Sequence, residues 1–241
     1  MTAALFLCDD LAGDTVVLSG PEGRHAATVR RVQVGEAVDL ADGRGTRARC
    51  TVAALGHDTV ELRVVERLVE PPPAPWLVVA QGIAKGDRGE LAVELATEVG
   101  VDEVLPWAAA RCIVKWEGVR GERALARWRS TAREAGKQSR RARHPVVGDA
   151  VGLDGLVSRA AGATTLVLHE QATTPLASVV LPADGEVLLV VGPEGGITGA
   201  ELAALSAAGA TAVRLGASVL RTSTAGAAAA AVVSARTARW A

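Results

Sequence analysis

The sequence is poor in cysteine and in aromatic residues. Its 241 residues include three Cys, five Trp, one Phe and no Tyr. Cys8, Cys50 and Cys112 lie far apart and form no CxxC motif, which argues against a disulfide framework and against a zinc site. We therefore expect no bound metal, and the cysteine usage is typical of a reducing compartment such as the cytoplasm.

Long apolar runs are absent as well. The first ten residues lack a basic region followed by an apolar stretch, so no signal peptide is predicted. No 18-residue window is both apolar and uncharged, and the Ala-rich stretch 225–233 is too short to span a bilayer. We expect a cytoplasmic protein that has no membrane partner.

Lysine is scarce, and positive charge is unevenly placed along the chain. The net charge is −1, and the only lysines are Lys85, Lys115 and Lys137. The preference for Arg over Lys reflects either coding bias or a need for guanidinium forks that bind phosphate or carboxylate. Residues 120–144 carry nine Lys/Arg and two Asp/Glu, whereas the remaining segments are mildly acidic. This stretch is too one-sided for ordinary pairing along a helix. It is interpreted either as a solvated face or as a docking surface for a polyanion, whose binding would depend strongly on salt.

Strand and turn patterns divide the chain into two domains. Short apolar runs separated by Gly, Pro and Asp turn signals predict a small β-barrel in residues 1–70, with strands at 16–18, 37–40, 47–52 and 60–64. The Asp42-Gly43 pair predicts a hairpin between two of them. Residues 71–75 are a stiff, proline-rich linker. From residue 76 to 241, strand-like runs alternate with helical segments, which predicts a largely parallel sheet flanked by helices, with strands at 76–81, 164–168, 186–191 and 211–215.

Two helices are predicted from the spacing of their apolar residues. The apolar stripe of the first contains Leu91, Leu95, Val99 and their neighbours. The buried stripe of the second contains Leu125, Trp128, Ala132 and Ala135. Beside this second stripe, an adjacent face of the same helix is expected to carry a basic row made of Arg129, Arg133, Lys137 and Arg140.

The densest motif, at residues 187–198, is a buried strand that runs into a glycine-rich turn. Thr198 and Glu201 have the spacing of a capping box, so a helix is predicted to begin just after Thr198. The turn is either a tight structural connection or a ligand cradle, because glycines let backbone approach a small molecule closely. It matches neither a Walker loop nor GxGxxG, which disfavours phosphate binding.

Two further motifs follow strands. Residues 215–225 leave a strand, pass Gly216 and reach a helix start rich in hydroxyls. There Arg221 is either a surface charge or the lone cation at the carboxyl end of a strand, beside the first glycine turn. Ser218 lacks the following Gly of a nucleophile elbow, which disfavours a hydrolase. His169 and Glu170 follow another strand; the histidine is either structural or part of a site, since open α/β sheets bind ligands at the carboxyl ends of their strands.

Taken in order, these motifs resemble the RsmE family of 16S rRNA uridine-N3 methyltransferases, within the SPOUT (trefoil-knot) class. The resemblance runs through nearly the whole chain and is most specific at Gly192-Pro193-Glu194-Gly195-Gly196 and from Leu215-Gly216 to Thr224-Ala225. It also includes Arg24 to Arg31 through Gly35, Asp42-Gly43, Gln81 to Gly86, Glu98 to Val101, Arg111-Cys112, Glu134 to Ser139, and Pro145. Three positions depart from the family pattern: the family often has Arg at Ser218 and Glu at Ser223 and Lys137.

The resemblance implies an α/β protein in which residues 1–70 form a PUA-like β-barrel that helps hold rRNA. Residues 76–241 would form a SPOUT methyltransferase domain with a deep trefoil knot. It further implies S-adenosyl-L-methionine as cofactor, 16S rRNA or the small ribosomal subunit as substrate, and a homodimer with sites at its interface. The alternatives are a SPOUT methyltransferase for another RNA position, and a non-catalytic rRNA-binding assembly factor.

Site residues follow from the resemblance together with the chemistry of uracil. Arg221 is expected to stabilise negative charge that develops on the base, and Glu194 or a phosphate-bound water to assist removal of the N3 proton. The expected cofactor-binding residues are Leu168, His169, Gly192, Pro193, Gly196, Leu215, Gly216, Val219, Leu220 and Thr222. The expected RNA-binding residues are Arg24, His25, Arg31, Arg129, Arg133, Lys137, Gln138, Arg140 and Arg141.

Overall fold

The computed structural model describes residues 3–240, and their internal contacts divide them into two compact units. The first unit contains the chain up to Pro72 together with Gly136–His144. The second contains Pro73–Ala135 and the chain from Pro145 onward. The predicted domain boundaries did not include the return of residues 136–144 to the N-terminal unit. Within the described range, no helix is long and apolar enough to cross a membrane.

The first unit is built on a five-stranded sheet with the order β1-β3-β4-β5-β2. Its strands are Ala4–Leu7 (β1), Thr15–Leu18 (β2), Ala37–Ala41 (β3), Thr46–Leu55 (β4) and Val60–Val69 (β5). The four predicted strands are confirmed, and β1 is added to them. Strands β3 and β4 pair antiparallel, so the hairpin predicted at Asp42-Gly43 is confirmed. The Asp42 carboxylate accepts the backbone N–H groups of Arg44 and Thr46 at 2.7 and 2.9 Å, which holds that turn closed.

Side chains that alternate along these strands make the core of the first unit. Because successive residues of a strand point to opposite faces, buried residues alternate with more exposed ones in β2 and in the middle of β4. Val38 and Leu40 of β3 lie opposite Cys50 and Ala48 of β4, and all four side chains are buried in one core with Phe6. Helix α1 (Gly20–Arg24) and the following π-helical turn η1 (His25–Val29) cover this core, with Ala26 inside it.

The second unit contains a six-stranded parallel sheet with the order β11-β9-β10-β6-β7-β8. Its strands are Trp76–Gly82 (β6), Glu103–Trp107 (β7), Val146–Val147 (β8), Thr164–Leu168 (β9), Glu186–Val191 (β10) and Thr211–Val213 (β11). The four strands predicted in this domain are confirmed, with β11 shorter than expected. The parallel α/β architecture expected for the C-terminal domain is therefore confirmed.

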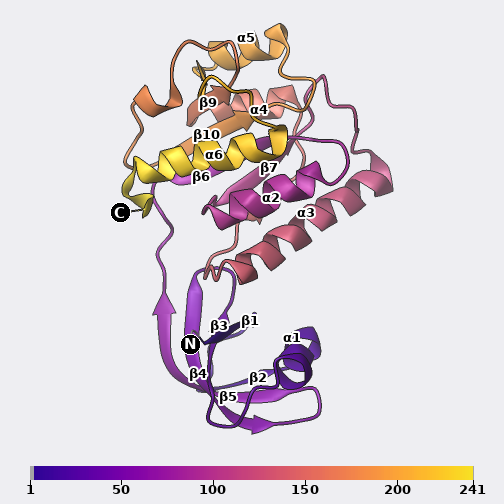
Figure 1. The fold of residues 1–241 in the computed structure, drawn as a ribbon, viewed down its shortest axis with the longest axis vertical. Helices are drawn as coiled ribbons and strands as arrows, with labels where there is room; N and C mark the ends of the chain where they lie inside the picture. The colour runs from indigo at the N-terminus through magenta and orange to yellow at the C-terminus, as the bar shows by residue number, and fades with distance from the viewer. Residues whose placement is uncertain (1–2, 241) are drawn as a thin grey trace. The chain divides into compact units, whose positions relative to one another are not determined.

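Helices cover both faces of this sheet. Helices α2 (Arg88–Glu98), α3 (Gly118–Gln138) and α6 (Thr222–Ala235) pack on one face, and α6 lies beside α2 across β6 and β10 (Figure 1). Helices α4 (Leu153–Ala160) and α5 (Gly199–Ala207) pack on the other. Short 3-10 turns follow at Leu176–Ser178 (η2) and Ala238–Trp240 (η3). Since neither face of β10 meets solvent, all residues of its run 187–191 are buried.

The apolar stripe predicted for α2 is only partly buried: Val99 packs against the core, but Leu91 does not. Leu91 is 41% exposed, whereas the buried residues of this helix are Gly89, Ala92, Val93, Ala96 and Thr97. The reason is close packing, because small residues let α2 approach the Ala-rich helix α6 and helix α3. A Cβ atom at Gly89 would lie 2.7 Å from the Trp128 ring of α3.

The stripe predicted for α3 is confirmed, since Trp128, Ala132 and Ala135 are buried and Leu125 packs against the core. The basic row beside it is shorter than predicted. Helix α3 ends at Gln138, and Arg140 lies in the following turn with a φ of +59°. A residue in that left-handed conformation cannot continue a right-handed helix, so Arg140 does not share the helical face of Arg129 and Arg133.

Candidate functional site

Three loops meet at one edge of the parallel sheet, where strands β9, β10 and β11 end as neighbours. They are residues 168–170, 192–197 and 214–222, and together they line a cavity of about 700 Å³. Every residue predicted to bind cofactor or to take part in catalysis lines this cavity. These residues are Leu168, His169, Gly192, Pro193, Glu194, Gly196, Leu215, Gly216, Val219, Leu220, Arg221 and Thr222. The carboxyl ends of parallel strands are where open α/β sheets bind ligands.

The glycine turn after β10 is too tightly packed for side chains at two of its positions. A Cβ atom at Gly192 would lie 2.9 Å from Ile197 Cγ1, and one at Gly195 would lie 2.9 Å from Arg111 Cβ. Gly196 has a φ of +73°, which favours glycine, and its N–H donates to the Pro193 carbonyl at 2.8 Å. The turn therefore presents bare backbone to the cavity, a surface that fits a small ligand bound through peptide groups.

The capping box predicted after this turn is confirmed. Thr198 is the N-cap of α5, its Oγ1 accepts the Glu201 N–H, and the Glu201 carboxylate accepts the Thr198 N–H at 2.8 Å. Glu201 is buried, and its other oxygen accepts the Ala110 N–H at 2.7 Å. Burial raises the pKa of Glu201, but the hydrogen bonds from Ala110 and Thr198 outweigh it and leave that pKa below its ordinary value. The carboxylate thus fixes the start of α5 to the loop after β7.

Arg221 is the N-cap residue of α6, with extended backbone, and its carbonyl accepts the N–H groups of Thr224 and Ala225. Its side chain makes no hydrogen bond or ion pair within residues 3–240, so the guanidinium remains available to a ligand in the cavity it lines. The prediction that Arg221 is the lone cation at this edge is wrong, because Arg88, Arg111 and Arg214 also line the cavity.

Of the added arginines, Arg111 supports the glycine turn directly, since its Nη1 donates to the Gly195 carbonyl at 3.0 Å. Sequence reasoning gave these arginines no site role because they come from three loops far apart in the chain. Of the three, only Arg111 belongs to a segment of the family resemblance, the Arg111-Cys112 pair. The guanidinium groups outnumber the lining carboxylates, Glu170 and Glu194, which makes the cavity electropositive.

Glu194 lies at the centre of the glycine turn, with a side chain that is 22% exposed. Its Oε1 accepts the Lys85 N–H at 3.1 Å and lies 3.8 Å from Arg88 Nη1. No partner for Oε2 is found in the described part of the chain. One oxygen therefore ties the turn to the loop after β6, and the other is available for proton transfer.

His169 has the structural role considered for it, and it also lines the cavity. Its backbone N–H donates to the Val213 carbonyl at 2.9 Å, which joins the ends of β9 and β11. Its Nδ1 accepts the Gln171 N–H at 3.2 Å, which closes the following turn, while the residue also lines the cavity.

Comparisons with known proteins agree with this architecture. A family model described as an RNA methyltransferase domain matches residues 71–234, and one described as an RNA methyltransferase PUA domain matches residues 18–65. The chain belongs to this RNA methyltransferase family. The ribosomal RNA small subunit methyltransferase E of Mycobacterium bovis is 49% identical, over 100% of this chain and 94% of that protein. The one from Bacillus subtilis is 31% identical, over 88% and 86%.

A solved structure is similar over the whole length of this methyltransferase. The crystal structure of a ribosomal RNA small subunit methyltransferase E from Neisseria gonorrhoeae, bound to S-adenosyl methionine, superposes with a TM-score of 0.88 at 28% identity. The superposition covers 98% of each chain. The N-terminal PUA-like domain and the C-terminal SPOUT-type α/β domain expected from the sequence are confirmed.

In the first unit of the methyltransferase, three predicted RNA-binding residues lie on or next to α1 and η1, and all are exposed. Arg24 Nε lies 3.6 Å from Asp58 Oδ2 in a solvent-exposed ion pair. The His25 ring packs edge-on against Phe6, with 5.9 Å between the ring centroids. Arg31 has a φ of +54°, and its Nε donates to the Thr28 carbonyl at 3.4 Å.

The remaining predicted RNA-binding residues are divided between the units: Arg129 and Arg133 belong to the second, and Lys137, Gln138, Arg140 and Arg141 to the first. Arg129 donates to the Val147 carbonyl at 3.2 Å and to Asp149 at 2.9 Å, whereas Arg133 is exposed. The side chain of Lys137 is only 14% exposed, and its Nζ lies 2.7 and 2.9 Å from the carboxylate oxygens of Glu22. Lys137 thus already has an anionic partner inside its own unit.

Proposed function

We propose that this protein transfers a methyl group from S-adenosyl-L-methionine to N3 of a specific uridine in 16S rRNA. The observation that carries the proposal is the cavity at the carboxyl ends of β9, β10 and β11, in a chain of the RNA methyltransferase family. Relatives along its full length are named for methylation of small-subunit ribosomal RNA, and the Neisseria structure holds S-adenosyl methionine.

The cavity fits this cofactor by its bare backbone turns. The peptide groups of residues 192–196 and 215–220, with Leu168 and His169, would hold the adenosine and methionine portions, and Thr222 would support them. When bound, S-adenosyl-L-methionine supplies an electrophilic methyl group on a positively charged sulfur. The glycines at 192 and 195 admit no side chain without a shift of Ile197 or Arg111, so a substitution there would disturb the turn that lines the cavity.

Methylation of the uracil base requires two things of the protein: removal of the N3 proton and stabilisation of the negative charge that results. Uridine N3 is an imide nitrogen that becomes a good nucleophile only as it loses its proton, and the negative charge then spreads onto the uracil oxygens. Arg221, a permanently charged fork without a partner in residues 3–240, stabilises that charge. Oε2 of Glu194 accepts the N3 proton while Oε1 stays bound to the Lys85 N–H. Because N3 lies on the Watson–Crick edge, the target base must be unpaired when it enters.

The basic side chains outside the cavity would hold the RNA through its phosphates. Arg24, His25 and Arg31 of the first unit would do so together with Arg129, Arg133, Lys137, Gln138, Arg140 and Arg141. Their contributions differ, because Arg133 has no partner within residues 3–240 whereas Lys137 is paired with Glu22. Neutralising Arg24, Arg31 and Arg133 should therefore flatten the salt dependence of RNA binding, and neutralising Lys137 should change it least.

We also propose that the protein works as a cytoplasmic homodimer with a knotted C-terminal domain. Two exposed apolar residues on the cavity wall, Val219 and Leu220, would be covered by the second subunit. Light scattering of the purified protein tests the dimer, and a monomer at working concentration would refute it.

The decisive experiment compares wild type with Arg221→Ala. We expect the wild type to bind S-adenosyl-L-methionine in a calorimetric titration and to methylate small-subunit RNA at N3 of one uridine, mapped by mass spectrometry. The variant should bind the cofactor and lose methyl transfer. Full turnover by the variant would refute the role of Arg221. Methylation at another position would indicate a different SPOUT specificity, and no cofactor binding by the wild type would indicate an assembly factor.

A further inference from the structure

A buried glutamine connects strand β6 to the walls of the cavity. Gln81, near the end of β6, is 1% exposed, and its Nε2 donates to Thr222 Oγ1 at 2.9 Å and to the Gly82 carbonyl at 3.2 Å. Thr222, the first residue of α6, donates in turn to the Gly192 carbonyl at 2.7 Å. Three segments that are far apart in the sequence are thus joined by two consecutive side-chain hydrogen bonds.

The direction of these hydrogen bonds follows from the donors available. A threonine hydroxyl has one proton, and the Gly192 carbonyl can only accept. The proton of Thr222 is therefore committed to Gly192, and its oxygen must accept from its other neighbour. This orients the Gln81 amide with its nitrogen toward Thr222. A carboxylate in place of that amide would compete with Gly192 for the same proton.

The surroundings leave little room for a substitute. A Cβ atom at Gly82 would lie 2.5 Å from the Pro193 backbone nitrogen. A Cβ atom at Gly226 of α6 would lie 3.1 Å from Val79, 3.4 Å from Val191 and 3.6 Å from Gln81 Oε1. Strand β6, the glycine turn and α6 are therefore in close backbone contact around the pair. A polar group that lost its partner here would stay unsatisfied, which is costly in a buried position.

We propose that Gln81 and Thr222 are positioning residues that hold the Gly192–Gly196 turn and the start of α6 in fixed register around the cofactor cavity. Gln81 itself does not line the cavity, so it acts through Thr222. Because Thr222 directly follows Arg221, the same pair holds the backbone from which the Arg221 side chain extends. The inference rests on the proposed function, since it takes the cavity to be the cofactor site.

The first test removes the hydroxyl without changing its shape. Thr222→Val removes the hydrogen bond to the Gly192 carbonyl and leaves the Gln81 amide nitrogen with the Gly82 carbonyl as its acceptor, whereas Thr222→Ser keeps both hydrogen bonds of the hydroxyl. We expect Thr222→Val to weaken cofactor binding in calorimetry by about tenfold. Thr222→Ser should remain within about threefold of wild type. Gln81→Glu, measured at pH 8, should also weaken cofactor binding. The carboxylate can only accept a hydrogen bond, so it would compete with the Gly192 carbonyl for the hydroxyl group of Thr222.

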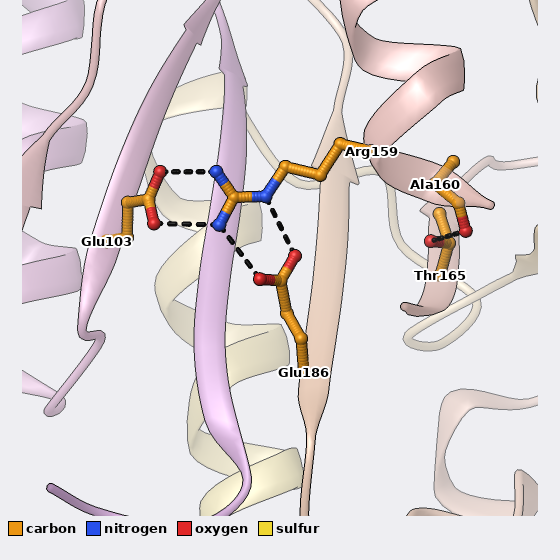
Figure 2. Close-up of polar contacts among 5 residues, drawn as sticks. All are labelled: Glu103, Arg159, Ala160, Thr165 and Glu186. Carbon is orange, nitrogen blue, oxygen red and sulfur yellow. Dashed lines mark hydrogen bonds and ion pairs between the residues drawn. The ribbon is translucent and has the colours of Figure 1, made fainter. Parts of the chain in front are cut away.

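Thr165 offers a matched control. It is a buried threonine near the start of β9, and its Oγ1 donates to the Ala160 carbonyl at 3.2 Å (Figure 2). Thr165→Val thus loses the same kind of bond in the same unit, away from the residues that line the cavity. We expect it to lower the thermal midpoint as much as Thr222→Val does while leaving cofactor affinity unchanged. Wild-type affinity in both Thr222→Val and Gln81→Glu would overturn the proposal.

Hydrogen exchange of the ligand-free protein gives a readout that does not depend on the cofactor. Amides of the glycine turn and of the first turn of α6 should exchange faster in Thr222→Val, and not in Thr165→Val. Faster exchange in a protein whose wild type binds no S-adenosyl-L-methionine would refute the proposed cofactor and keep the positioning role. Unchanged exchange would refute the positioning role, whatever the cofactor.

Discussion

Arg159 and Glu103 are joined by two parallel hydrogen bonds, of 2.6 and 2.7 Å, between the guanidinium and the carboxylate (Figure 2). The same guanidinium donates twice to Glu186, at 2.8 Å each. Hydrogen bonds to Glu186 and then to Glu103 raise the pKa of Arg159 above its ordinary range. Glu103 and Glu186 begin β7 and β10, so one side chain of α4 ties two strands together at the edge opposite the cavity.

We expect Arg159→Leu to lower the free energy of unfolding by about 2 kcal/mol, because it leaves two half-buried carboxylates facing each other without their cation. Urea unfolding followed by circular dichroism measures this loss. The control is Arg127→Leu, which removes a more exposed pair with Glu90 and should cost less than about 0.5 kcal/mol. Equal losses in the two variants would show that the fork contributes no more than a surface ion pair.

A second pair is fully buried and fixes the C-terminal turn. Arg239 Nη1 lies 2.6 Å from Asp102 Oδ2, with side-chain exposures of 5% and 0%, and the same oxygen accepts the Leu77 N–H at 2.8 Å. Arg239→Met should lower the free energy of unfolding by about 3 kcal/mol, since it removes the positively charged partner of a buried carboxylate. The double variant Arg239→Met/Asp102→Asn should recover part of that loss in the same urea assay. A double variant that is less stable than the single one would contradict this account.

The strands that form the site could be predicted because a parallel sheet covered on both faces yields continuous apolar runs, as in residues 187–191. Their carboxyl ends then indicated where the loops would meet, and the structure gathers the predicted cavity residues there. Strand β7 was missed because it contains Pro106, which breaks a strand pattern. Strand β8 has only two residues and leaves no periodicity to detect.

The errors elsewhere come from contacts that are distant in sequence. The apolar stripe of α2 was misplaced because close helix packing buries glycine and alanine and leaves Leu91 outside. The partner of Lys137 is Glu22, which is 115 positions away, and the role of Gln81 depends on Thr222, 141 positions away. Helix α3 ends before Arg140, which has a positive φ. Arginine rarely adopts that conformation, so no signal in the sequence marked this end of the helix.

The buried carboxylate of Glu201 predicts a pH dependence. Its pKa in the folded protein lies below the ordinary value of 4.5. The ionised carboxylate therefore contributes its full stabilisation above pH 4.5, and this stabilisation is lost as the pH falls through the lowered pKa of the folded protein. We expect the thermal midpoint of the wild type to fall more steeply than that of Glu201→Gln between pH 5 and pH 3. At pH 7 the variant should be less stable by about 1 kcal/mol. Parallel curves for the two proteins would refute this role.

The close packing around Gly82 indicates that the backbone beside the cavity cannot move freely. An alanine Cβ there would lie 2.5 Å from the Pro193 nitrogen and 2.8 Å from the Gly192 carbonyl carbon, and neither backbone atom can yield without moving the turn. Gly82→Ala should therefore weaken S-adenosyl-L-methionine binding by about a hundredfold or more. The control is Gly199→Ala in the first turn of α5, where a Cβ meets nothing within 4 Å, and cofactor affinity should stay at the wild-type level. Calorimetric titration measures both, with the unfolding midpoint recorded to show that each variant is folded. Wild-type affinity in Gly82→Ala would show that the turn can shift without loss, and the glycine would then matter only for packing.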